Sequence, residues 1–165
     1  MRSLLLIILC LIFPLNALAA VDELELKANF IFRFAQFTTW PPPPSKEIQL
    51  CVLGAKGIYD ELDKFKERKI NGNPVRVIKL SSIKSAADCH VLFIGAQERI
   101  NSLMSTVLPL PILVIGENAE AFEEKVMIVL VTEPNRISFK INRSQANNVG
   151  LVMSAQLLKL AKEVR

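Results

Sequence analysis

Hydrophobic residues recur along the chain with two alternating periods. In some segments they return every three or four positions, as on one face of a helix, and in others they alternate or run on without a break, as in strands. The segments follow one another as 48–54 (strand), 58–68 (helix), 75–80 (strand), 81–87 (short helix), 89–95 (strand), 99–108 (helix), 112–116 (strand) and 118–122 (short helix). Alternating strands and helices predict an α/β fold, with a mostly parallel sheet flanked by helices on both faces. The nearly continuous apolar run at 89–95 predicts a central strand.

The alternation of strands and helices ends near the C-terminus. Two apolar segments, 126–131 and 136–141, are separated by only four residues, which predicts an antiparallel β-hairpin. A closing helix is expected from about Asn142 or Val149 to Lys162. Its expected apolar stripe consists of Met153, Leu157, Leu160, Ala161 and Val164, and its expected outward residues are Gln156, Lys159 and Glu163.

The segment 22–37 predicts a helix with an unusually narrow polar stripe. Asp22 is its expected N-cap, with Glu25 three residues later as the partner in a capping box. At helical spacing the polar residues share one narrow arc, and Phe32 falls beside it; the polar residues are Asp22, Glu25, Asn29, Arg33 and Gln36. A helix with so little polar surface must be covered on most sides, either by its own fold or by another protein.

Four consecutive prolines, Pro41 to Pro44, follow this helix and are here called the proline strap. Prolines cannot continue a helix and favour an extended polyproline II path. Such a segment can be a ligand for an aromatic groove. We favour the interpretation that it is a stiff connection that lets Trp40 pack on the domain.

The first twenty residues have the pattern of a signal peptide. Arg2 precedes ten apolar residues, 4–13, which is too short a run to cross a bilayer because about 20 residues are needed. Ala17 and Ala19 then form the small-x-small pattern that signal peptidase accepts. We therefore expect residues 1–20 to be removed on export to the periplasm, and residues 21–165 to form one soluble domain. The alternative is a buried N-terminal helix, but such a helix would carry polar residues on one side.

The charge distribution does not indicate a nucleic-acid-binding protein. The net charge is +4 for the whole chain and becomes +3 once Arg2 leaves with the signal peptide. Lys and Arg are scattered among Asp and Glu, as on an ordinary solvated surface.

Two cysteines, Cys51 and Cys89, remain after the expected cleavage. In an oxidising compartment two thiols are expected to pair if the geometry permits, and both lie in strands that are plausible neighbours. The bridge would close a loop of about 40 residues and contribute roughly 4 kcal/mol in the chain-entropy model. The alternative is that both are buried free thiols.

Residue types that carry catalysis or bind metals are scarce. His90 is the single histidine and has no further ligands at metal-binding spacing, so we expect neither a metal site nor a cofactor. No nucleophile elbow or paired acid and base is visible, so an enzyme is not expected. The best candidate for a small-ligand site is the turn with Gly54, Lys56 and Gly57, together with Glu117 at the carboxyl end of another strand.

Several segments together resemble the YfiR family of periplasmic proteins. They are Lys27 to Pro41, Leu50 to Gly54, Ile70 to Val75, Cys89 to Ile94, Phe139 to Asn142 and Gly150 to Leu160, in the family's order and spacing. The resemblance implies an α/β domain, often dimeric, that represses an inner-membrane diguanylate cyclase through the cyclase's periplasmic sensor region. Cyclic di-GMP signalling, and with it biofilm formation, would be lowered. It also implies that an outer-membrane lipoprotein of the OmpA/Pal kind can withdraw the repressor.

The resemblance also bears on the cysteines and on the contact surface. Cys51 and Cys89 match one family disulfide, whereas the second disulfide of some members has no counterpart, which leaves redox sensing through that pair in doubt. The residues expected to contact the partner lie on the first and last helices and at the strap; they are Phe32, Gln36, Trp40, Gln156 and Lys159. Two alternatives stay open: Phe32 could be tucked under the proline strap, and the protein could instead bind a small ligand at the strand ends.

Overall fold

The computed structural model describes residues 16–117, 119–134 and 136–165; for residues 16–22 and 119 only the backbone is described. The expected signal peptide therefore lies outside the described residues, apart from the backbone of 16–20. Within the described ranges, no helix combines the length and apolar character that a membrane crossing requires.

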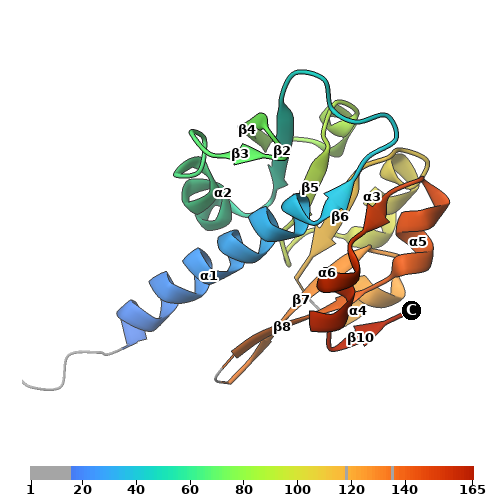
Figure 1. Ribbon diagram of the computed structural model, residues 1–165. Helices are drawn as coiled ribbons and strands as arrows, with labels where there is room; N and C mark the ends of the chain where they lie inside the picture. Colours follow the sequence, from blue (N-terminus) through green and yellow to red (C-terminus); the bar gives the residue numbers. More distant parts are fainter. Residues whose placement is uncertain (1–15, 118, 135) are drawn as a thin grey trace, which may run out of the picture.

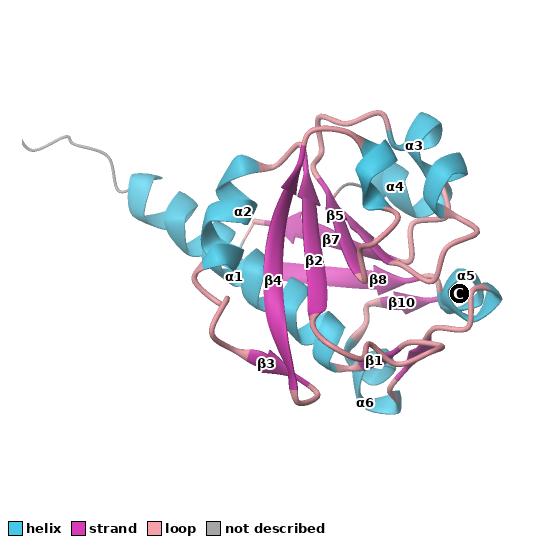
Figure 2. Ribbon diagram, turned by 90° about the horizontal axis from the view of Figure 1, so that it is seen from above, coloured by secondary structure: helices cyan, strands magenta, loops and turns pink. Residues whose placement is uncertain are grey.

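Eight strands form one curled, mostly parallel sheet (Figure 1). Their order across the sheet is β10 (Glu163–Val164), β8 (Arg136–Ile141), β7 (Ile128–Glu133), β6 (Leu113–Gly116), β5 (Val91–Ile94), β2 (Ile48–Leu53), β4 (Asn73–Leu80) and β3 (Lys69–Ile70). Only the β7–β8 and β3–β4 pairs are antiparallel. In Figure 2, β4, β2 and β5 run side by side, while β8 and β10 lie across them because the sheet twists. The expected α/β fold and its C-terminal hairpin are confirmed.

Helices cover both faces of the sheet, as predicted. α1 (Asn16–Gln36) and α2 (Lys56–Asp63) lie on one side in Figure 1, and α3 (Ile100–Val107) and α4 (Ala119–Glu123) on the other. A short 3₁₀ helix, Ile83–Ala86, precedes β5. The central strands bury alternate residues in two separate cores: Val91 and Phe93 of β5 belong to the α1 side, and Leu92 and Ile94 to the α3 side.

α1 begins at Asn16, six residues before the predicted N-cap Asp22. The intervening residues include three alanines and one leucine, which have the highest helix propensities, so the backbone continues as a helix past Asp22. Asp22 is therefore inside the helix, and the predicted start was wrong.

The prediction of one closing helix was also wrong. The segment contains α5 (Arg143–Asn148), the short strand β9 (Val152–Met153) and α6 (Ala155–Leu160), and it ends in β10. Gly150 has a φ of +77°, a left-handed conformation that ends α5. β9 then pairs with β1 (Thr38–Thr39), so strand pairing replaces the helix.

This break also changes the burial of the predicted apolar stripe. Leu157 is buried, but Leu160 is 67% exposed and Val164 is 42% exposed. α6 starts afresh at Ser154, whose hydroxyl accepts a hydrogen bond from the Leu157 amide.

Gly150→Ala is expected to destabilise the protein more than Gly72→Ala. Both glycines have positive φ, which costs about 1–2 kcal/mol for any L-residue. A Cβ at Gly150 would also lie 2.6 Å from Cγ of Pro41, whereas a Cβ at Gly72 meets nothing within 4 Å. Overpacking adds roughly 1–3 kcal/mol, so the difference between the two urea-unfolding free energies measures the contact with Pro41. Equal losses would show that Gly150 is needed only for its conformation.

Candidate functional site

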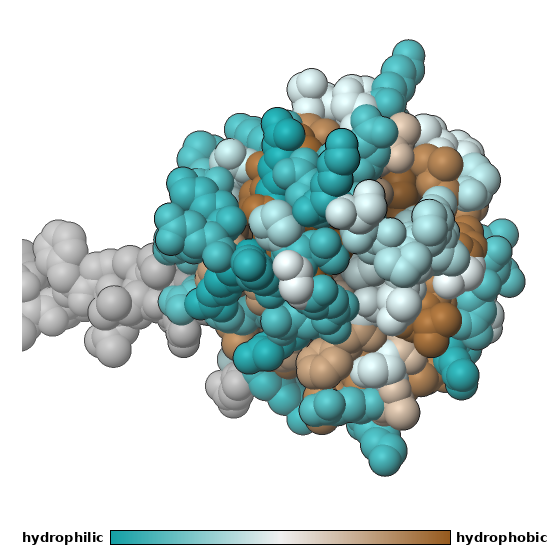
Figure 3. Space-filling view, turned by 45° about the horizontal axis from the view of Figure 1, so that its top comes forward, coloured by the Kyte–Doolittle hydropathy of each residue, from teal (hydrophilic) through white to brown (hydrophobic). Residues whose placement is uncertain are grey.

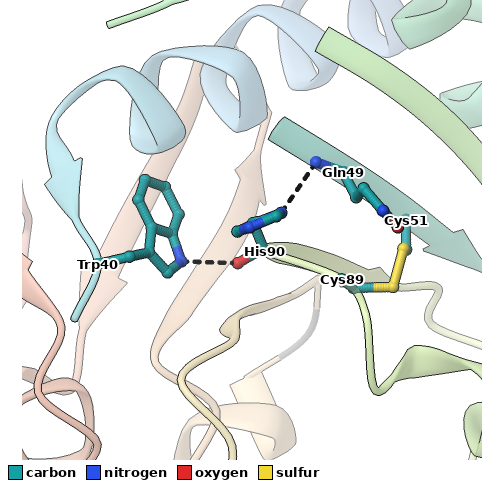
Figure 4. The surroundings of a disulfide bond; sticks show 5 residues. All are labelled: Trp40, Gln49, Cys51, Cys89 and His90. Atoms are coloured by element: carbon teal, nitrogen blue, oxygen red, sulfur yellow. Dashed lines mark hydrogen bonds between the residues drawn. A yellow bond between two sulfur atoms is a disulfide. The ribbon is translucent and has the colours of Figure 1, made fainter. Parts of the chain in front are cut away.

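A disulfide joins Cys51 of β2 to Cys89, which lies two residues before the start of β5 (Figure 4). The two Cα atoms are 6.0 Å apart, within the usual range for a disulfide. β2 and β5 are hydrogen-bonded neighbours, with Cys51 opposite Leu92. The predicted pairing of the two cysteines is therefore present, and it links the middle of β2 to the segment just before β5.

His90, next to the disulfide, makes hydrogen bonds through both its ring and its backbone. Its Nδ1 accepts a hydrogen bond from the Gln49 amide at 3.0 Å, and its carbonyl oxygen accepts one from Nε1 of Trp40 at 3.0 Å (Figure 4). The two rings are edge to face, with centroids 6.2 Å apart. Burial lowers the pKa of His90, and the negative charge of Glu47 opposes this in part. Because Nδ1 is an acceptor, the imidazole is neutral in this arrangement.

Trp40 packs into the domain, as the interpretation of the proline strap predicted. Its side chain is 5% exposed, and the strap begins directly after it, with a cis peptide bond between Pro41 and Pro42. Below the strap lies an open cavity of about 420 Å³. Its lining includes Trp40, Asp88, Cys89, His90, Pro111 and the four prolines.

The residues predicted to contact a partner divide into buried and exposed ones. Phe32 is 4% exposed and packs edge to face on Phe65, at 5.4 Å between centroids, with the guanidinium of Arg68 over its ring. It is therefore covered by the segment after α2 and not by the proline strap. Trp40 is buried as well. Burial of both side chains argues against their direct contact with a partner in this conformation.

The other predicted contact residues reach the surface. Gln36 is half-buried and accepts a hydrogen bond from Arg33 at 3.0 Å, while Gln156 and Lys159 are exposed on α6. The end of α1 and the start of α6 are joined, because β1 pairs with β9 and the Ser154 amide donates to the Phe37 carbonyl. A role for these three residues in partner contact remains a prediction.

Few large hydrophobic side chains are exposed among the described residues. On the face shown in Figure 3, hydrophobic residues form small patches separated by hydrophilic ones. Among the described residues, the exposed large hydrophobic side chains are Leu26, Val152, Leu160 and Val164. Val152 of β9 and Leu160 of α6 flank the segment that carries Gln156 and Lys159.

The four residues predicted as a small-ligand site do not converge. Gly54 and Lys56 line an open cavity of about 340 Å³ with Glu98 and Lys79. Gly57 is not in this lining and lies against α1, since a Cβ on it would be 3.0 Å from a methyl group of Leu24. Glu117 does follow the end of β6, as predicted, but it is not in this lining either.

Glu117 is instead held by Lys27 of α1. The Lys27 Nζ lies 2.9 Å from Glu117 and 2.8 Å from Glu23, and Glu117 also accepts a hydrogen bond from the Ala96 amide. The Lys27 and Glu117 side chains are only 12% and 17% exposed. These contacts place the first helix over the carboxyl ends of β5 and β6, where open α/β sheets often bind ligands.

The electrostatics of this group follow from burial and pairing. Burial alone would lower the pKa of Lys27, but its bonds to Glu23 and Glu117 outweigh that effect and raise it. The pKa of Glu23 is lowered, first by the hydrogen bond from Lys27 and against the effect of its own burial. Sequence reasoning did not single out Lys27. Its helical position beside Glu23 at i, i+4 was the available signal.

A metal ion would need at least three ligands from side chains such as His, Cys, Asp or Glu. Among residues 16–117, 119–134 and 136–165, no three His, Cys, Asp or Glu side chains are grouped so that they could bind one.

Comparisons with known proteins give one family and several solved structures, two of which are described here. The model of the YfiR/HmsC-like family matches residues 24–162. A conserved domain protein from Vibrio cholerae O1 biovar El Tor superposes with a TM-score of 0.64 at 11% identity, over 86% of this chain and 60% of that one. An ABC domain from Streptococcus pneumoniae, solved in complex with L-Trp, superposes with a TM-score of 0.55 at 12% identity, over 84% of this chain and 60% of that one.

At such identities the two structures show a shared fold alone. This chain also spans only about three fifths of the length of each. A search of curated proteins found no match.

Proposed function

The chain belongs to the YfiR/HmsC-like family, and from this we propose that it represses an inner-membrane diguanylate cyclase by contacting the cyclase's periplasmic sensor region. The match over residues 24–162 is the observation that carries the proposal. It covers all strands and helices except the start of α1 and the whole of β10. The family consists of periplasmic regulatory proteins and is not a class of enzymes.

The disulfide supports a place outside the cytoplasm. Disulfides persist in oxidising compartments such as the periplasm and are rare in the reducing cytosol. Cys51 and Cys89 are 0% and 6% exposed, so their bridge is part of the core. Export through a signal peptide at residues 1–20 belongs to the same proposal.

Repression requires only binding that differs between two states of the cyclase. A protein that binds the inactive state of a sensor better than the active one shifts the equilibrium by that difference in affinity. A preference of roughly 10⁴-fold, or about 5.5 kcal/mol, would move the sensor from almost fully active to almost fully inactive. Withdrawal by an OmpA/Pal-like lipoprotein, and function as a homodimer, are further parts of the proposal.

We place the contact on the exposed side of α6. Gln156 and Lys159 supply polar groups there, and Val152 and Leu160, 60% and 67% exposed, supply apolar area beside them. Such a mixture of apolar and polar groups is typical of non-obligate interfaces. Gln36 lies at the end of α1, which the β1–β9 pair joins to this surface. Phe32 and Trp40 then support the surface from within.

Deletion of the gene is expected to raise cellular cyclic di-GMP, and a plasmid copy of the wild-type gene is expected to restore it. Lys159→Glu should restore repression poorly, since it reverses a charge at the centre of the proposed contact. Lys84→Glu makes the same charge change at an exposed residue of the 3₁₀ helix and should restore repression fully. Unchanged cyclic di-GMP after deletion would reject the repressor. Full restoration by Lys159→Glu would reject the α6 surface.

A further inference from the structure

His90 connects three separate parts of the structure, namely β2, β6 and Trp40. Its amide donates to the Gln49 carbonyl of β2 at 2.9 Å, and its Nδ1 accepts from the Gln49 amide at 3.0 Å. Its carbonyl oxygen accepts from both Trp40 Nε1 and the Leu113 amide of β6. The preceding residue, Cys89, is in the disulfide. Trp40 and the proline strap are thus attached to the sheet through His90 (Figure 4).

Protonation removes one of these connections on chemical grounds. A neutral imidazole has one acceptor nitrogen, whereas an imidazolium has two donors and none. A proton on Nδ1 would point at the Gln49 N–H. That N–H would then have lost its acceptor and would face a second donor, the Nδ1–H. Loss of its hydrogen bond is unfavourable for a half-buried amide, so the ring is expected to turn away. The ring also contacts Trp40 edge to face, so this rotation would disturb Trp40.

The charged groups around the ring have opposite signs. Glu47 lies two residues before Gln49 and pairs with Arg76 of β4 at 3.6 Å, and Lys46 and Asp88 lie on the flanking loops. Burial of the ring has the largest influence and lowers the pKa of His90 below 6.5, while Glu47 raises it in part. The neutral, hydrogen-bonded form is therefore fully favoured above pH 6.5. The stability that this neutral form contributes is lost as the pH falls from 6.5 through the lowered pKa of His90.

We propose that His90 is a pH-sensitive latch: on protonation its ring leaves the edge-to-face contact with Trp40, which loosens Trp40 and the proline strap on the sheet. β1 directly precedes Trp40 and pairs with β9, and β9 leads into α6. Release of Trp40 would therefore loosen the surface that carries Gln156 and Lys159. This last step rests on the proposed function; the release of Trp40 itself does not. Acidification of the periplasm would then weaken repression.

Tryptophan fluorescence provides a direct test, because Trp40 is the only tryptophan. Between pH 7.5 and 4.5, the emission of the purified protein is expected to shift to the red with a single midpoint below pH 6.5, while the far-UV circular dichroism stays constant. His90→Asn offers an amide oxygen in place of Nδ1 and does not titrate, so its emission should not shift. Glu47→Gln should lower the midpoint but keep the shift, because the charge of Glu47 raises the pKa of His90.

A second measurement on the wild-type protein needs no variant. The Gln49 amide should be protected from hydrogen exchange at pH 7.5, and its protection factor should fall at pH 5. The latch is refuted if this protection is constant, if His90→Asn shows the wild-type shift, or if the circular dichroism changes over the same pH range.

Cells buffered at pH 7.5 and 5.5 separate this inference from the proposed function. In the wild type, cyclic di-GMP should rise at pH 5.5 towards the level of the deletion strain, while in His90→Asn it should stay low. Protonation of one group can weaken binding of the protein to the cyclase by at most about tenfold for each unit by which the pH falls. A deletion without effect at either pH would reject the proposed function alone. Wild type and His90→Asn with equal levels at both pH values would reject the latch as a regulator.

Discussion

Replacement of Cys51 and Cys89 by alanine is expected to lower the free energy of unfolding by about 4 kcal/mol. The disulfide spans 38 positions of the sequence, and a closed loop of that length removes much conformational entropy from the unfolded chain. Domains of this size are stable by only about 5–15 kcal/mol. The expected loss is therefore a large part of the total free energy of unfolding. It should strongly lower the guanidinium concentration at which half of the protein is unfolded.

Reductant separates the effect of the bond from that of the substitution. The wild-type protein in dithiothreitol should unfold near the midpoint of the Cys51→Ala/Cys89→Ala variant, and that variant should be indifferent to dithiothreitol. If the wild-type midpoint does not change with reductant, the bridge is either absent or contributes little. Loss of repression under the same conditions would connect this stability to the proposed function.

Phe34→Ala is expected to cost about 3–5 kcal/mol of unfolding free energy. Phe34 is 1% exposed on α1, and its ring lies 4.9 Å from that of Phe139 in β8. Truncation leaves a cavity between the first helix and the sheet, and the surrounding strands can close it only in part. Urea unfolding of the purified variant measures the loss.

Phe30 is the matched control for this substitution. It lies one helical turn earlier and also contacts Phe139, at 5.8 Å, but it is only partly buried. Phe30→Ala removes the same atoms and should cost clearly less than Phe34→Ala. Equal losses would mean that burial does not decide the contribution of this aromatic cluster.

Much of the fold was predictable because the pattern of neighbouring apolar and polar residues indicates the strands and helices. Continuous apolar runs such as 91–94 identified the central strands, and the short connection between β7 and β8 identified the hairpin. The disulfide was predictable because only two cysteines follow the expected signal peptide, and each lies in or beside a strand of the same sheet. In these cases local patterns and tertiary structure favour the same result.

The candidate site was less predictable because its contacts are distant in sequence. Lys27 pairs with Glu117 across 90 positions, and Trp40 donates to the His90 carbonyl across 50. No local pattern indicates which carboxylate a lysine will meet, or that a backbone carbonyl will accept from an indole. For the same reason, Phe32 beside a polar arc did not reveal that Phe65 would cover it.

The amino-acid sequence by itself determined the α/β class, the order of most strands and helices, the pairing of the cysteines and the resemblance to a family. Only the tertiary structure decided that the last helix is divided, that Phe32 and Trp40 are buried, and that His90 joins the strap to the sheet. The physical reason is that periodicity and composition act between neighbours, whereas β1–β9 pairing and side-chain burial depend on segments brought together by the whole chain.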